Sequence, residues 1–164
     1  MDETSLAAQL HALQDQVRTL LAIESIRRLK FAYWRAVRSG RPEDVGRCFS
    51  REARFDYGAA APLIGREAIT GFFRQVLADR VAVVLHGHNA EIDVTSPTTA
   101  HGLWQLENMR ILEDGSGTRM GNGYVEDYVL EDCEWKVSRS VVEYLYHEPI
   151  RVQKITGLPA GSQQ

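Results

Sequence analysis

The feature that most constrains the fold is a change of sequence pattern near residue 80. Before it, apolar residues recur at intervals of three and four, which is typical of amphipathic helices. After it come four long runs, at residues 82–94, 100–112, 119–130 and 135–146. Turn-forming stretches such as TSP at 95–97 and EDGSG at 113–117 separate these runs. Strands joined by short turns predict a meander of consecutive antiparallel hairpins.

The first half of the chain predicts helices at residues 22–39, 42–48 and 66–77, with a short strand at 53–57. Gly40 ends the first of these helices, and Pro42 suits the first turn of the second. Helices followed by a long meander indicate an α+β fold, with helices packed on one face of a curved antiparallel sheet. If helices cover that face at one end only, the sheet forms a cone-shaped cavity, a common place for a small ligand.

The extreme N-terminus carries an apolar stripe of its own. Leu6, Leu10, Leu13, Val17 and Leu20 follow heptad spacing and predict an amphipathic helix over residues 1–21. Because about two heptads are too few for a coiled coil alone, the helix either lies on the domain's own surface or contacts another subunit. We expect the domain itself to span residues 22–148, followed by a flexible tail at 149–164.

Composition excludes several classes of partner. The formal net charge is -3 and no run of Lys or Arg is present, so neither nucleic acid nor a membrane surface is an expected partner. Cys48 and Cys133 lie far apart and outside metal-type spacing, which predicts free thiols in a reducing compartment. The polar N-terminus is not a secretory signal and no long apolar run exists, so we expect a cytoplasmic protein.

Two histidines are set into the apolar run AVVLHGHNAEIDV at residues 82–94. Side chains alternate along a strand, so His86 and His88 share one face while Leu85 points to the other. A bulge near Gly87 could bring one histidine back to the face of Leu85. Either both histidines are structural or surface residues, or at least one reaches the cavity. We do not expect a metal site, because a pair at i and i+2 has no obvious third ligand.

Several segments together resemble the SnoaL-like family, which has the fold of nuclear transport factor 2. The resemblance rests on IESIRRLKFAYWRAV, FDYG, GREAI, LHGHNAEI, HGLWQLEN and YVEDYVLEDCEWKV, and it extends from about residue 22 to residue 146. The branch that looks closest contains bile-acid 7α-dehydratase and scytalone dehydratase. The resemblance implies a cone-shaped cavity, dehydration of a polycyclic or aromatic hydroxylated ketone without a cofactor, and a homodimer or homotrimer.

The catalytic pattern of the family transfers only in part. The tyrosine of the helix motif matches Tyr33, and the second histidine of the strand motif matches His88. The family's catalytic histidine falls on Leu85, and its aspartate falls on Arg38. A unit charge about 5 Å from an imidazole is worth roughly 3 kcal/mol at an effective dielectric constant near 20. A histidine beside Arg38 is therefore a weaker base than one beside an aspartate.

Further candidates come from strand parity. The family's acidic position on the second run of the meander matches Asn108, which shares a face with Trp104, and its basic position on the last run matches Tyr144. These three side chains are expected to line the cavity. Glu126 and Asp127 are neighbours within a strand, so one of them faces each way.

The sequence thus predicts Tyr33, His86 and His88 as catalytic candidates, and Leu85, Trp104, Asn108, Tyr144 and Arg38 as ligand-binding candidates. The first hypothesis is a cofactor-independent lyase or isomerase of the dehydratase type. The alternative is a non-catalytic ligand-binding protein, or a partner subunit, that keeps the cavity but has lost the catalytic His and Asp. A small apolar or polycyclic ligand is the expected partner in each enzymatic or ligand-binding case.

Overall fold

The computed structural model describes residues 3–58, 61–78 and 82–153. Three helices and six strands follow one another along the chain. The helices are α1 (Glu3–Ser39), α2 (Pro42–Arg47) and α3 (Arg66–Val76). The strands are β1 (Phe49–Tyr57), β2 (Leu63–Ile64), β3 (Ala82–Ser96), β4 (Thr99–Ile111), β5 (Ser116–Glu131) and β6 (Glu134–Arg151).

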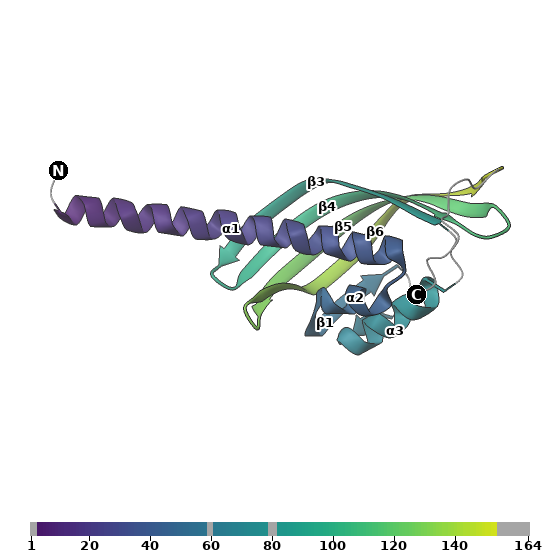
Figure 1. Cartoon of the computed structure of the whole chain (residues 1–164), viewed down its shortest axis with the longest axis horizontal. Helices are drawn as coiled ribbons and strands as arrows, with labels where there is room; N and C mark the ends of the chain where they lie inside the picture. Colours follow the sequence, from purple (N-terminus) through teal and green to yellow (C-terminus); the bar gives the residue numbers. More distant parts are fainter. Residues whose placement is uncertain (1–2, 59–60, 79–81, 154–164) are drawn as a thin grey trace.

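The strands form one curved sheet in the order β2-β1-β6-β5-β4-β3, and the helices lie on one side of it (Figure 1). Strands β3 to β6 form the predicted meander of antiparallel hairpins. Strand β1 pairs in parallel with β6 and in antiparallel fashion with β2. The predicted α+β architecture is confirmed, while the parallel β1–β6 pairing and the short β2 are additions that the sequence pattern did not indicate.

The two helices predicted before residue 40 form the single helix α1 of 37 residues. No glycine or proline interrupts this segment, so nothing in the sequence ends the helix at the predicted boundary near residue 21. Gly40, with φ of 66°, follows the helix as predicted, because that backbone conformation is accessible to glycine.

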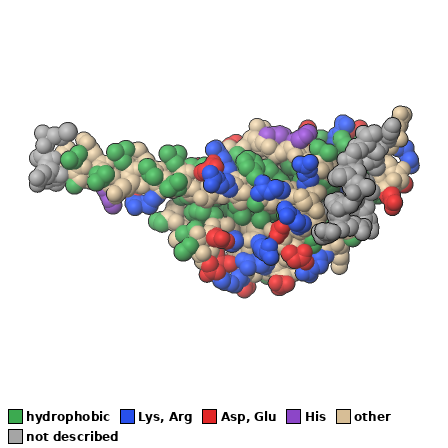
Figure 2. Space-filling model, viewed as in Figure 1, with side chains coloured by type: hydrophobic (Ala, Val, Ile, Leu, Met, Phe, Trp, Pro, Cys, Tyr) green, Lys and Arg blue, Asp and Glu red, His purple; other side chains and the backbone are tan. Residues whose placement is uncertain are grey.

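The two halves of α1 have different surroundings. Its C-terminal half buries Ile26, Lys30, Tyr33 and Ala36 against the sheet. Its N-terminal half extends past the end of the sheet (Figure 1), and green apolar side chains line this extension (Figure 2). The side chains of the heptad stripe are 53% to 65% exposed. The expectation that this stripe packs against the domain's own surface is therefore wrong for the single chain.

Aromatic rings fill the core between α1, α3 and β1. Phe55 is fully buried, with its ring centroid 5.7 Å from those of both Phe49 and Phe73. Where α1 crosses β3, the ring of Trp34 lies against Gly87, and a Cβ atom at Gly87 would be 2.0 Å from that ring. The absence of a side chain on Gly87 therefore sets how closely α1 approaches the sheet.

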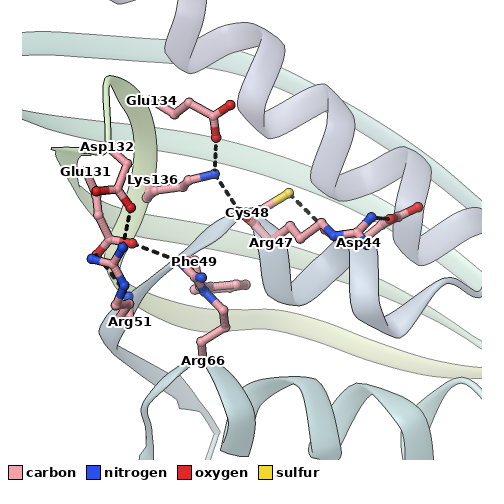
Figure 3. Close-up of polar contacts among 10 residues, drawn as sticks. All are labelled: Asp44, Arg47, Cys48, Phe49, Arg51, Arg66, Glu131, Asp132, Glu134 and Lys136. Atoms are coloured by element: carbon pink, nitrogen blue, oxygen red, sulfur yellow. Dashed lines mark hydrogen bonds and ion pairs between the residues drawn. The ribbon is translucent and has the colours of Figure 1, made fainter.

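A polar cluster holds the β5–β6 turn against β1, α2 and α3 (Figure 3). Arg66 joins the elements, because its Nε donates to the Phe49 carbonyl oxygen and its Nη2 lies 2.8 Å from Glu131 Oε1. Lys136 Nζ donates to the Arg47 carbonyl oxygen at 3.0 Å, and Arg51 pairs with Asp132. These contacts tie the β5–β6 turn to β1, α2 and α3.

The remaining expectations concern cysteines, the tail and membranes. Cys48 is buried and Cys133 is exposed, and both are free thiols as predicted. Strand β6 continues to Arg151, so part of the predicted tail is strand, while residues 154–164 lie outside the described residues. Within the described ranges, no helix is long and apolar enough to cross a membrane.

Candidate functional site

The faces of β3 decide where its histidines point. Leu85 is packed against the core, whereas His86 and His88 are exposed on the outer face of the sheet. A register shift follows His88, and Asn89 there has φ of 53°. This bulge turns the later residues Ile92 and Val94 toward the core but leaves both histidines outside.

The predicted opposition of Leu85 to the two histidines is thus found, but the bulge lies after His88 instead of near Gly87. The structure brings neither histidine to the cavity. It does not bring them to a third ligand either: in the described part of the chain, no group of three or more His, Cys, Asp or Glu side chains is placed to hold a metal ion.

A pocket of about 90 Å³ lies on the inner face of the sheet, beneath α1 and α3. Leu85 from β3, Leu106 from β4 and Phe73 from α3 contribute apolar walls. Tyr33 projects into it from the buried stripe of α1, and Tyr124 from β5. Three of the predicted site residues, Tyr33, Leu85 and Asn108, therefore meet in one pocket.

Phenols supply polar groups in this pocket, because Tyr33, Tyr57 and Tyr124 all line it. Tyr33 and Tyr124 are buried, whereas Tyr57 is partly buried. Burial is the main cause that raises the pKa of Tyr33 and Tyr124 well above the usual value of about 10. Both groups therefore keep their protons at physiological pH and act as hydrogen-bond donors rather than as bases.

An ion pair lies behind the phenols. Lys30 Nζ is 2.6 Å from Glu126 Oε1, and both side chains are almost completely buried. The ammonium group lies 3.8 Å from the centroid of the Tyr124 ring, within the range of a cation–π contact. Burial lowers the pKa of Lys30, and the neighbouring Glu126 carboxylate opposes that shift.

Glu126 is held by more than the lysine. The Tyr128 hydroxyl donates to Glu126 Oε2 at 2.5 Å, and Ser140 Oγ donates to Glu126 Oε1 at 2.9 Å. Trp104 Nε1 in turn donates to the Tyr128 oxygen at 2.7 Å. Such a network satisfies the buried charges, and it makes Glu126 the inward member of the predicted pair, with Asp127 facing out.

The polar residues at the other side of the pocket come from β4. Asn108 Nδ2 donates to Asn122 Oδ1 at 2.7 Å, while the Asn122 Nδ2 is buried with no hydrogen-bond partner. Arg110, two residues further along the same face, also lines the pocket. It is the one charged residue among the described lining residues.

Besides the two histidines, three more predicted site residues lie away from the pocket lining. Trp104 is buried within the network of Glu126, with its ring edge-on to Trp34. Tyr144 is 41% exposed and packs against the Tyr57 ring at 5.6 Å. Arg38 is exposed near the end of α1. Their assigned roles in ligand binding stay predictions that the placement does not support.

The sequence interpretation missed Lys30, Tyr57, Tyr124 and Arg110. For Arg110 a signal existed, because it has the same strand parity as Asn108. Tyr124 likewise shares parity with Glu126 on β5. For Lys30 no such signal existed, because one lysine in a helix that also carries several arginines is normally a solvated residue.

Comparison with known proteins gives a consistent result. Residues 18–141 match the SnoaL-like domain family. A solved structure of a candidate scytalone dehydratase from Novosphingobium aromaticivorans is 19% identical, with 82% of this chain and 91% of that chain covered and a TM-score of 0.75.

Two further solved structures have the same fold. A type 2 hexachlorocyclohexane dehydrochlorinase, LinA, is 16% identical, covering 88% of this chain and 99% of that one at a TM-score of 0.77. An NTF2-like protein with a cystatin-like fold from Novosphingobium aromaticivorans is 22% identical. The match covers 88% of this chain and 90% of that chain at a TM-score of 0.65. At these identities the likeness establishes the fold alone.

Proposed function

Because the chain belongs to the SnoaL-like family, we propose that its inner-face pocket binds a small aromatic molecule that carries a ketone or hydroxyl oxygen. The observation that carries the proposal is the pair of protonated phenols, Tyr33 and Tyr124, in an otherwise largely apolar pocket. Apolar walls with a few convergent polar groups are the usual composition of small-molecule sites.

The phenol protons support an oxygen acceptor on the ligand. Tyr33, Tyr57 and Tyr124 each bring one O–H proton to the pocket lining. A ketone or hydroxyl oxygen on the ligand offers lone pairs that can accept from these hydroxyl groups. A ligand with no oxygen would offer the buried Tyr33 and Tyr124 no acceptor, and a buried donor left unpaired costs about 1–3 kcal/mol.

The size of the pocket favours a single ring over the polycyclic ligand that the sequence interpretation included. An apolar cavity of roughly 150 Å³ holds one benzene molecule. The pocket here is about 90 Å³, so a ring must either extend through the mouth or displace side chains. Several fused rings would need a much larger rearrangement of a close-packed interior.

Conversion of the ligand is the second candidate function. The similarity to a dehydratase-like and a dehydrochlorinase structure favours elimination chemistry. Phenolic donors can polarise a ketone and stabilise the enolate that forms when the neighbouring carbon loses a proton. Elimination also needs a base, however, and the described lining residues include no His, Asp or Glu. Binding is therefore the function that this geometry supports best.

One probe tests both functions. β-Hydroxypropiophenone has a single ring, a ketone and a hydroxyl group that elimination would release as water, leaving phenyl vinyl ketone. We expect calorimetric titration to show saturable binding to the wild type and binding weakened about tenfold in Tyr33→Phe, because one hydrogen bond to the oxygen is lost. Chromatography of the mixture should recover the probe unchanged.

Tryptophan substitutions supply a matched control. Leu85→Trp fills the pocket and should abolish binding, whereas Val84→Trp adds the same ring on the outer face and should leave the dissociation constant unchanged. Binding that survives Leu85→Trp would disprove the site. Formation of phenyl vinyl ketone above the background rate would favour the lyase over the binding protein.

A further inference from the structure

Arg110 is placed unlike the other arginines of the described chain. It lies on β4 and lines the pocket, and its Nε is buried with no hydrogen-bond partner. No carboxylate pairs with it within the described ranges, although Arg51, Arg66 and Arg139 all have acidic partners. A guanidinium group stays charged at all accessible pH values.

The rest of the inner network does not neutralise this charge. Lys30, the cation behind the phenols, already has Glu126 as its partner at 2.6 Å. No acidic residue is among the described lining residues, so the pocket itself has a net positive charge. A partly buried cation with unused donors is costly until an anion binds it.

We infer that the ligand carries a carboxylate group that pairs with Arg110. This inference rests on the proposed function and adds the chemical class of the ligand, an aromatic acid. The planar guanidinium fork matches a carboxylate with two parallel hydrogen bonds. Along β4, Arg110 lies beyond Asn108 and well past Trp104, the residue that pairs with Tyr124. The carboxylate and the phenol-bound oxygen therefore occupy opposite ends of the ligand.

Benzoate and benzamide are suitable probes, because they share ring and size but differ in charge. Charged hydrogen bonds contribute more than neutral ones, so the wild type should bind benzoate at least about tenfold more tightly than benzamide. Arg110→Met should remove this preference. Arg119→Met is the matched control, because it changes net charge equally at an exposed outer-face position and should keep the preference.

Thermal unfolding provides a second measurement on the same proteins. Without ligand, Arg110→Met should be at least as stable as the wild type, because the removed guanidinium group is half-buried and its Nε has no hydrogen-bond partner. Benzoate should raise the melting temperature of the wild type and of Arg119→Met but not that of Arg110→Met. Equal affinity of the wild type for both probes, or a preference that survives in Arg110→Met, would overturn the inference.

The two proposals fail in distinguishable ways. If the wild type binds β-hydroxypropiophenone but does not prefer benzoate over benzamide, the proposed binding function is retained and the inference of a ligand carboxylate is overturned. Failure of the wild type to bind any of the three probes would overturn both.

A second, independent observation concerns the N-terminal half of α1. Its heptad stripe, defined above as Leu6, Leu10, Leu13, Val17 and Leu20, has no covering element within the described residues. The positions that flank the stripe are uncharged, and the ionic pair of Asp15 and Arg18 lies on the far side of the helix. Identical stripes can therefore meet with no repulsion between like charges.

The geometry points to a second copy of this chain as the occupant of the heptad stripe. A charged partner is disfavoured, because the residues that flank the heptad stripe have no charges with which it could pair. Light scattering after size exclusion should give an oligomer for the wild type. Leu13→Glu should give a monomer, because it places a charge within the heptad stripe of each copy. Ala12→Glu should keep the oligomer, because it adds the same charge outside the heptad stripe. A monomeric wild type, or an oligomer that survives Leu13→Glu, would overturn this inference.

Discussion

The two faces of strands β3 to β5 carry similar chemistry in opposite surroundings. On the inner face, Glu126 is buried in contact with Lys30, Tyr128 and Ser140. One residue along, on the outer face, Asp127 lies 2.8 Å from His101, and both side chains are about 40% exposed. The comparison teaches that burial, more than residue type, decides where a functional site can form in this fold. His86 and His88 lie on the outer face, whereas Tyr124 and Tyr128, whose pKa values are raised by burial, lie on the inner face.

The largest expected difference between the faces is in stability. Lys30→Met leaves the Glu126 carboxylate buried with no cation, which should lower the free energy of unfolding by about 3–5 kcal/mol. Lys30→Met combined with Glu126→Gln should recover much of that loss, because no buried charge remains. Urea unfolding measures the free energy of unfolding of the single and the double variant.

The outer pair is the control for this experiment. Asp127→Asn should change the free energy of unfolding by no more than about 1 kcal/mol, because exposed ion pairs contribute little. If Asp127→Asn and Lys30→Met lowered the free energy of unfolding equally, the predicted difference between the outer and the inner face would be contradicted.

The next largest difference in the free energy of unfolding is expected between substitutions at two adjacent positions on β3. Gly87→Ala puts a methyl group into the ring of Trp34 and forces α1 to shift, which should cost about 1–3 kcal/mol of unfolding free energy. His86→Ala, one residue earlier on the exposed face, should stay within about 0.5 kcal/mol. The same urea titrations report both values, and a larger loss in His86→Ala would contradict the packing described for α1.

A smaller effect is expected from alkaline pH. The pKa values of Tyr33, Tyr124 and Tyr128 are raised by burial, so the folded chain keeps protons that the unfolded chain releases near pH 10. Their contribution to stability is complete below the unfolded pKa and is lost as pH rises above it. In a spectrophotometric titration these phenols should ionise together with unfolding. Ionisation of all the tyrosines before the loss of helical circular dichroism would contradict their burial.

Much of the fold was predictable because it depends on local signals. Turn residues and strand alternation placed β3 to β6 to within five residues of their bounds, and Gly40 placed the end of α1. The parallel pairing of β1 with β6 was not predictable, because alternation shows which face a residue occupies but not which strand lies beside it.

The candidate site was less predictable for a related reason. Tyr33, Leu85 and Asn108 were identified through the family resemblance. Lys30 was missed because its burial depends on Glu126, which is 96 residues away in sequence. The inward turn of Ile92 and Val94 was missed because the bulge at Asn89 reverses the parity, and no proline or glycine at that residue marks it.

The central claim is that the inner-face pocket, and not the pair of histidines, is the functional site. The most direct test is the affinity for β-hydroxypropiophenone of three proteins: the wild type, Tyr33→Phe, and the double variant with His86→Ala and His88→Ala. The account predicts about tenfold weaker binding in Tyr33→Phe and an unchanged dissociation constant in the double variant. Loss of binding in the double variant, with Tyr33→Phe unaffected, would contradict it.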